Sequence, residues 1–127
     1  MDSDDIMLSD RLKKQIYFMD EHPDILVCGS NMKLFKNIPH KVCISETHHP
    51  QMVDWNFIKQ NIPLWLANHP TLCYRKSAIL NIGNYNVYDT TLKFIQEDYD
   101  LELQLIKKYG SLVNLQETLI LYRLHLY

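Results

Sequence analysis

The chain has 127 residues, of which 46% are hydrophobic and 11% aromatic, so it can fill the core of one domain of ordinary size. Thirteen Lys and Arg against fifteen Asp and Glu leave a net charge of -2, and the basic residues are scattered, which excludes the basic stripe of a nucleic-acid-binding protein. No apolar run approaches the roughly 20 residues of a membrane helix, and the acidic start lacks the pattern of a signal peptide. We therefore expect a single domain over residues 1–127, without a membrane anchor.

Three cysteines, Cys28, Cys43 and Cys73, are widely spaced and stand among apolar neighbours. Their odd number and the absence of a Cys-x-x-Cys motif argue against a disulfide or zinc framework. We expect reduced thiols in the core of a cytoplasmic protein.

The first predicted element is a helix over residues 11–21. Ser9 or Asp10 can cap its start, and Pro23 lies just beyond its end. Its apolar residues recur at helical spacing and are expected to form the buried face: Leu12, Ile16 and Met19.

Short apolar runs predict strands along the rest of the chain, with helices between them. The predicted strands are residues 25–29, 32–35, 41–44, 71–74, 112–115 and 119–122. The predicted helices are residues 51–60, 77–82 and 97–109, and residues 84–91 are expected to form a loop. Helices between strands favour an α/β layered fold over a bundle or a sandwich. Because the first predicted element is a helix, the sheet is expected to be short of strands.

Acidic residues gather in two places. Asp2, Asp4 and Asp5 follow the first methionine, and Glu97 and Asp98 begin the predicted helix over residues 97–109. Taken alone, the first group is typical of a solvated terminus and the second of first-turn acids that favour the helix dipole. Taken together, they suggest a divalent cation at one wall of a cleft and a proton acceptor at the other.

Four segments in a fixed order carry a resemblance to a known family. They are MDSDDIMLSDRLKKQI, LANHPTLCYRKSAILNIGNYN, QEDYDLELQLIKKYG and LYRLH. Through them the chain, from Asp2 to His125, resembles the second half of the family 2 inverting glycosyltransferases of the GT-A fold. The resemblance implies a partial GT-A-like mixed sheet flanked by helices, lacking the N-terminal Rossmann-like strands that bind the nucleotide in that family.

The resemblance also implies a set of metal-binding and catalytic residues. An inverting transfer displaces a nucleoside diphosphate at the anomeric carbon, so the enzyme must stabilise the leaving group and deprotonate the acceptor hydroxyl. Asp4, with Asp2 beside it, matches the aspartate-x-aspartate motif that binds Mg²⁺ or Mn²⁺. Asp98 matches the catalytic base, and Glu97 before it would fix its direction.

Further positions match the leaving-group and acceptor sides of such a site. Arg123 and His125, in the Tyr-Arg-x-His segment, match positions that approach the diphosphate or the metal in relatives. His69 matches the acceptor-side wall, and Trp65 beside it can either stack on a sugar or pack in the core. The remaining histidines are expected at the surface: His22, His40, His48 and His49.

The resemblance implies metal-dependent transfer of a sugar from a nucleotide-sugar donor to a saccharide or protein hydroxyl. Without nucleotide-binding strands the chain is expected to bind the donor weakly and to leave an apolar sheet edge open. We therefore expect a homodimer, or a partner chain that supplies the first half. The alternative is a non-catalytic remnant, or a binding or scaffold module of the same fold.

Overall fold

The computed structural model describes residues 1–36, 43–61, 63, 65–85 and 97–125, and the structural statements below refer to these residues. They form an α/β fold in which helices flank a mixed sheet of six strands. Within these segments, no helix has both the length and the apolar character needed to cross a membrane.

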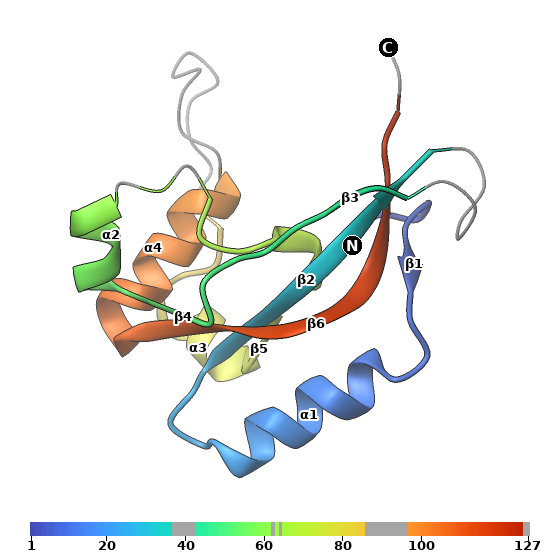
Figure 1. Cartoon of the computed structure of the whole chain (residues 1–127). Coiled ribbons are helices and arrows are strands. Elements are labelled where there is room, and N and C mark those ends of the chain that lie inside the picture. The colour runs from blue at the N-terminus through green and yellow to red at the C-terminus, as the bar shows by residue number, and fades with distance from the viewer. Residues whose placement is uncertain (37–42, 62, 64, 86–96, 126–127) are drawn as a thin grey trace.

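Two long parallel strands form the centre of the sheet, and Figure 1 shows them crossing the whole fold. They are β2 (Val27–Phe35) and β6 (Ser111–Arg123). The short strands β1 (Ile6–Met7) and β4 (Met52–Asp54) pair antiparallel with opposite ends of β6. The strands β3 (Cys43–Glu46) and β5 (Cys73–Tyr74) pair antiparallel with opposite ends of β2.

Three helices gather at one end of the long strands, and a fourth lies apart from them (Figure 1). The three are α2 (Trp55–Asn61), α3 (Lys76–Asn81) and α4 (Glu97–Tyr109), and the fourth is α1 (Arg11–Glu21). Leu101, Leu105 and Ile106 of α4 are fully buried and belong to a core that includes Val27 of β2 and Leu112 of β6. This packing fixes the start of α4 relative to the sheet, because apolar burial is the main term that stabilises such contacts.

The helix over residues 11–21 is confirmed, but its buried face differs from the prediction. Leu12 and Ile16 are 51% and 52% exposed. The side chains that α1 buries are Arg11, Gln15 and Met19. Arg11 and Gln15 turn inward because backbone carbonyls of the short 3-10 helix η1 (His69–Thr71) accept their hydrogen bonds. Local apolar spacing could not reveal partners more than 50 residues away.

Long-range pairing explains most of the other differences from the predicted elements. The run 32–35 and all but the first two residues of the run 25–29 belong to the single strand β2, and the two runs in residues 112–122 belong to β6. Polar residues between the runs suggested breaks, but the two strands pair across them, with register shifts beside Asn31. The predicted helix over residues 51–60 starts as β4, because this segment pairs with the beginning of β6.

The remaining predictions are met in part. Helices α3 and α4 are confirmed, and residues 71–74 divide into the end of η1 and strand β5. The expectation that a helix is the first element is wrong, since β1 follows the first aspartates directly and joins the six-stranded sheet. The expected lack of further N-terminal strands stays a prediction. Part of the predicted strand 41–44 and most of the predicted loop 84–91 lie outside the described residues.

The three thiols are free, and one of them is not in the core. Cys28 is buried and Cys73 is partly buried, whereas Cys43 is exposed. Strand β3, which contains Cys43, is exposed along its whole length. The prediction of three core thiols is therefore wrong for Cys43, because an apolar neighbourhood in the sequence does not bury an edge strand.

Candidate active site

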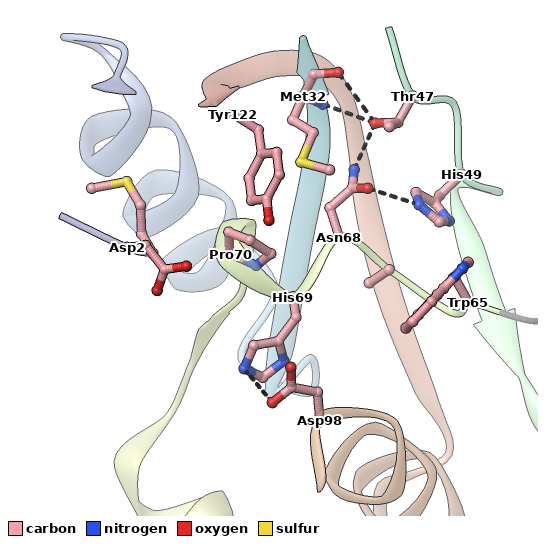
Figure 2. A pocket seen from close by; sticks show the side chains of 12 residues that line it. Asp2, Met32, Thr47, His49, Trp65, Asn68, His69, Pro70, Asp98 and Tyr122 are labelled. Carbon is pink, nitrogen blue, oxygen red and sulfur yellow. Dashed lines mark hydrogen bonds and ion pairs between the residues drawn. The ribbon is translucent and has the colours of Figure 1, made fainter. Parts of the chain in front are cut away.

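A pocket of about 500 Å³ lies between the start of the chain, the segment before η1 and the start of α4 (Figure 2). Four residues of the predicted site line it: Asp2, Trp65, His69 and Asp98. Figure 2 shows Asp2 on one side, Trp65 on the other, and His69 with Asp98 between them. This volume falls in the range of small-molecule sites.

The turn that contains His69 is anchored to β2 by buried polar side chains. Oγ1 of Thr71 accepts a hydrogen bond from the backbone N–H of Ser30 at 2.9 Å and donates one to the carbonyl of Asn68 at 2.8 Å. Nδ2 of Asn68 donates to the carbonyl of Ser30 at 2.8 Å and to Oγ1 of Thr47 at 2.7 Å. These hydrogen bonds fix the position from which the His69 side chain enters the pocket.

Two buried side chains of helix α1 also bind the turn. Nη2 of Arg11 donates to the carbonyl of Pro70 at 3.1 Å, and Nε2 of Gln15 donates to the carbonyl of Thr71 at 2.8 Å. Nε of Arg11 also donates to Oε1 of Gln15 at 2.8 Å. Arg11 is 7% exposed and Gln15 is 0% exposed. Their hydrogen bonds to the turn therefore replace hydrogen bonds with water and hold the turn in one conformation.

His69 joins the turn to helix α4. Its Nε2 lies 3.2 Å from Oδ1 of Asp98 and 3.1 Å from the hydroxyl of Tyr85. Its Nδ1 lies 3.5 Å from Oε1 of Glu102, which is one helical turn beyond Asp98. Imidazole, carboxylate and phenol groups therefore meet at one wall of the pocket.

The two carboxylates that face His69 differ in their contact with water. The Asp98 side chain is 41% exposed, whereas Glu102 is only 3% exposed. Burial raises the pKa of Glu102, the nearby His69 lowers it, and the charge of Asp98 raises it. Burial also raises the pKa of Tyr85, and the neighbouring Tyr74 adds to this effect.

Glu97 lies at the exposed first position of α4 and does not line the pocket. Together with Asp98 and Asp100 it places negative charge in the first turn, where the helix dipole stabilises acids. A role in fixing the direction of Asp98 stays a prediction for this residue.

The other predicted residues meet where the start of the chain reaches the end of β6. Oδ2 of Asp4 lies 2.5 Å from Nε2 of His125 and 3.9 Å from Nε of Arg123. The hydrogen bond with His125, followed by the positive charges of His125 and Arg123, holds the pKa of Asp4 below its usual value. Oδ1 of Asp5 accepts the backbone N–H of Arg123 at 3.0 Å, which ties the two segments together. Asp4 itself does not line the pocket, whereas Asp2 does.

The aspartates at the start of the chain are candidate ligands for a divalent cation. Across the described residues, no three His, Cys, Asp or Glu side chains converge on one point that could hold a metal. Mg²⁺ commonly takes only one or two protein carboxylates and completes its shell with waters and substrate phosphates. Asp4 is kept ionised by its cationic neighbours and Asp2 faces the pocket, so these two residues fit that mode of binding.

One histidine that lines the pocket was not predicted. His49, expected at the surface, is half-buried, with its Nε2 3.0 Å from Oδ1 of Asn68. Burial lowers the pKa of His49. No local signal could have revealed this contact, because the partners are 19 residues apart. His22 and His48 are exposed as expected, and His40 lies outside the described residues.

Glu102 was also missed, although the sequence contains a signal for it. It stands among Leu101, Leu105 and Ile106 on the buried face of α4, four residues after Asp98. An acid at such a position is rarely buried unless it is paired. Helical spacing could therefore have placed Glu102 beside the catalytic candidate.

Comparison with known proteins gives the class of relatives. No protein-family model matches the chain. It is 31% identical over 121 residues to a Haemophilus influenzae protein named an uncharacterized glycosyltransferase, covering 94% of this chain and 42% of the relative. It is 28% identical over 124 residues to the amylovoran biosynthesis glycosyltransferase AmsE of Erwinia amylovora, covering 94% and 42%. It is 34% identical over 130 residues to the O-antigen biosynthesis glycosyltransferase WbnJ of Escherichia coli, covering 98% and 46%.

Over nearly its whole length, this chain is similar to a part of proteins named glycosyltransferases. It spans less than half the length of these relatives, so the similarity concerns one part of them. The match to WbnJ extends over 98% of this chain, so it includes most of the residues that line the pocket.

Proposed function

We propose that this chain is the metal-binding and acceptor-binding part of an inverting glycosyltransferase of family 2 with the GT-A fold. The reaction is transfer of a sugar from a nucleotide-sugar donor to a hydroxyl of a saccharide or protein. The observation that supports it best is that Asp2 and Asp98, one from each acidic cluster, line the same pocket as His69 and Trp65. The similarity to glycosyltransferases supports the class of reaction.

In this proposal Asp98 is the general base. The acceptor oxygen forms a bond to the anomeric carbon, the bond from that carbon to the diphosphate breaks, and the proton passes to Asp98. A base must stand within hydrogen-bond reach of the hydroxyl it deprotonates. The Asp98 carboxylate is 41% exposed at the pocket wall, where an acceptor hydroxyl can approach it, and its Oδ1 lies 3.2 Å from Nε2 of His69.

The opposite side of the site would stabilise the departing diphosphate. Asp2 and Asp4 would hold Mg²⁺ or Mn²⁺, which neutralises the charge that develops on a departing diphosphate. Arg123 and His125 lie beside Asp4, and the guanidinium of Arg123 places positive charge at this side. The guanidinium of Arg123 is also held 4.7 Å above the ring of Phe35, so its direction is restricted.

Trp65 is the proposed platform for a sugar ring. Its side chain is 55% exposed although it lines the pocket, and an exposed aromatic ring in a pocket offers a flat apolar face. The neighbouring His49 also lines the pocket and offers a polar ring to sugar hydroxyls.

We also propose that the base and ribose of the donor are bound by residues outside these 127, on another segment, a partner chain or a second copy. The relatives are more than twice as long as the part that this chain matches. Leu12 and Ile16 leave an apolar stripe on the outer face of α1 that such a partner could cover. Light scattering on the purified chain tests the second copy, since a monomer at working concentration excludes the homodimer.

The test of the function is a transfer assay with UDP-sugars and GDP-sugars, with and without Mn²⁺, on the chain and on any longer natural polypeptide that contains it. We expect transfer that needs the cation and yields a product whose anomeric configuration, measured by ¹H NMR, is opposite to that of the donor. A product with retained configuration would contradict the mechanism. Transfer unaffected by a chelator would contradict the role of the metal.

A further inference from the structure

Glu102 is a buried acid that the proposed reaction does not yet use. It is 3% exposed on a helix face formed by Leu101, Leu105 and Ile106. A carboxylate is strongly hydrated in water, so its burial is unfavourable unless a donor or a positive charge replaces that water. The side chain that approaches its Oε1 is the His69 ring, at 3.5 Å.

The facing atom of His69 is unsatisfied. Nδ1 is buried and forms no hydrogen bond among the described residues. A buried polar atom without a partner is rare in folded proteins and calls for an explanation. Nδ1 and Oε1 of Glu102 would satisfy each other if they approached by a few tenths of an ångström, within the ordinary range of a hydrogen bond.

The other ring nitrogen is in a different environment. Nε2 lies 3.1 Å from the Tyr85 hydroxyl and 3.2 Å from Oδ1 of Asp98. When Nδ1 carries the hydrogen, Nε2 has a free lone pair that accepts the Tyr85 O–H. The hydrogen bond at one imidazole nitrogen thus decides which task is left to the other.

We propose that Glu102 is a positioning residue that accepts Nδ1–H of His69 and so keeps Nε2 as a proton acceptor beside Asp98. Its catalytic consequence rests on the proposed function. Asp98 takes the proton of the acceptor hydroxyl and passes it to Nε2 of His69. Asp98 is then a carboxylate again, and the imidazolium is balanced by the ionised Glu102. The proton finally leaves through the open pocket to water.

The tautomer of His69 tests this assignment without any need for transfer. The ¹⁵N-labelled chain would be studied by long-range ¹H–¹⁵N NMR at about pH 9, above the ordinary imidazole pKa. We expect the Nδ1–H tautomer in the wild type and in Glu102→Gln, whose amide oxygen still accepts. In Glu102→Leu the acceptor is lost, and we expect the ring to change to Nε2–H and donate to Asp98.

Glu21→Gln is the matched control, because it makes the same change of charge at an exposed position of α1. It should leave the His69 signals unchanged. An Nε2–H tautomer in the wild type would overturn the proposal, and this result stands even if Glu102→Leu does not fold. An unchanged tautomer in a folded Glu102→Leu would overturn it equally. A confirmed Nδ1–H tautomer in a chain that shows no transfer would count against the proposed function alone.

Discussion

The two acidic regions of the molecule place their carboxylates in opposite environments. Asp4 lies at the surface, where His125 and Arg123 surround it with positive charge and lower its pKa. Glu102 lies inside the fold, where burial raises its pKa and His69 only partly offsets that effect. The pKa of a carboxyl group is thus lowered in one region and raised in the other. The difference follows from partners and burial, and the sequence spacing of the acids does not determine it.

The largest expected effect is on the rate of transfer, and it distinguishes the proposed base Asp98 from the proposed metal ligand Asp4. Asp98→Asn should lower kcat by about 100-fold or more, because general-base catalysis contributes about 10²–10⁴-fold. Asp4→Asn should also lower transfer, but added Mn²⁺ should restore part of it, since the loss is one of metal affinity. Steady-state kinetics over a range of Mn²⁺ concentrations measures both.

Glu21→Gln again serves as the control and should leave kcat and KM unchanged. If added Mn²⁺ restored the activity of Asp98→Asn as well as that of Asp4→Asn, the proposal that Asp4 binds the metal and Asp98 accepts the proton would be wrong. An Asp98→Asn variant with full activity would remove Asp98 as the base.

A smaller effect concerns how rigidly the Asp98 side of the pocket is held. Thr71→Val keeps the shape of the side chain but removes the acceptor for the buried N–H of Ser30. We expect a loss of about 1–3 kcal/mol in the free energy of unfolding, the typical penalty for a buried group left without a partner. Urea denaturation measures it, with Ser77→Ala at an exposed position of α3 as the control. Equal stability of Thr71→Val and the control would show that this hydrogen bond does not anchor the turn.

The pH dependence of stability gives a finer test of the comparison. The pKa of Asp4 is lowered from 3.8, so its ion pairs stabilise the fold above that pH and are lost as the pH falls through the lower pKa. The pKa of Glu102 is raised from 4.5, so its ionisation reduces stability as the pH rises from 4.5 toward the raised pKa. At neutral pH, Asp4→Asn should therefore be less stable than the wild type, whereas Glu102→Gln should lose less stability than the wild type as the pH rises.

Thermal unfolding of the two variants from pH 3 to pH 7 measures these opposite trends. Both differences from the wild type should shrink toward acid pH, where the carboxyl groups are protonated. Parallel curves for the two variants would mean that both acids experience the same environment.

The helices were predictable because their signals are local. The helix over residues 97–109 has apolar residues at helical spacing and ends at Gly110, whose φ of 100° suits a residue without a side chain. The helix over residues 11–21 was also predicted, but its inward face was not. Arg11 and Gln15 are buried there by hydrogen bonds to the η1 turn, which only the tertiary structure creates.

Strands β1 and β4 could not be predicted for the same reason. Each has two or three residues and exists through its pairing with β6. In the site, the spacing and the family resemblance identified Asp2, Trp65, His69 and Asp98, which share one pocket. The contact of His49 with Asn68 joins loops that are distant in the sequence, and no pattern within either loop encodes it.

The most direct test of the account is to locate bound Mn²⁺–nucleotide by NMR. Paramagnetic Mn²⁺ broadens signals of nearby nuclei, so a titration of the ¹⁵N-labelled chain with Mn²⁺ and UDP or GDP maps where the cation lies. We expect broadening of the signals of Asp2 and Asp4 first, and of Trp65, His69 and Asp98 at higher loading. Broadening confined to the α1 face around Leu12 and Ile16, or none at saturating nucleotide, would contradict the shared pocket as the site of transfer.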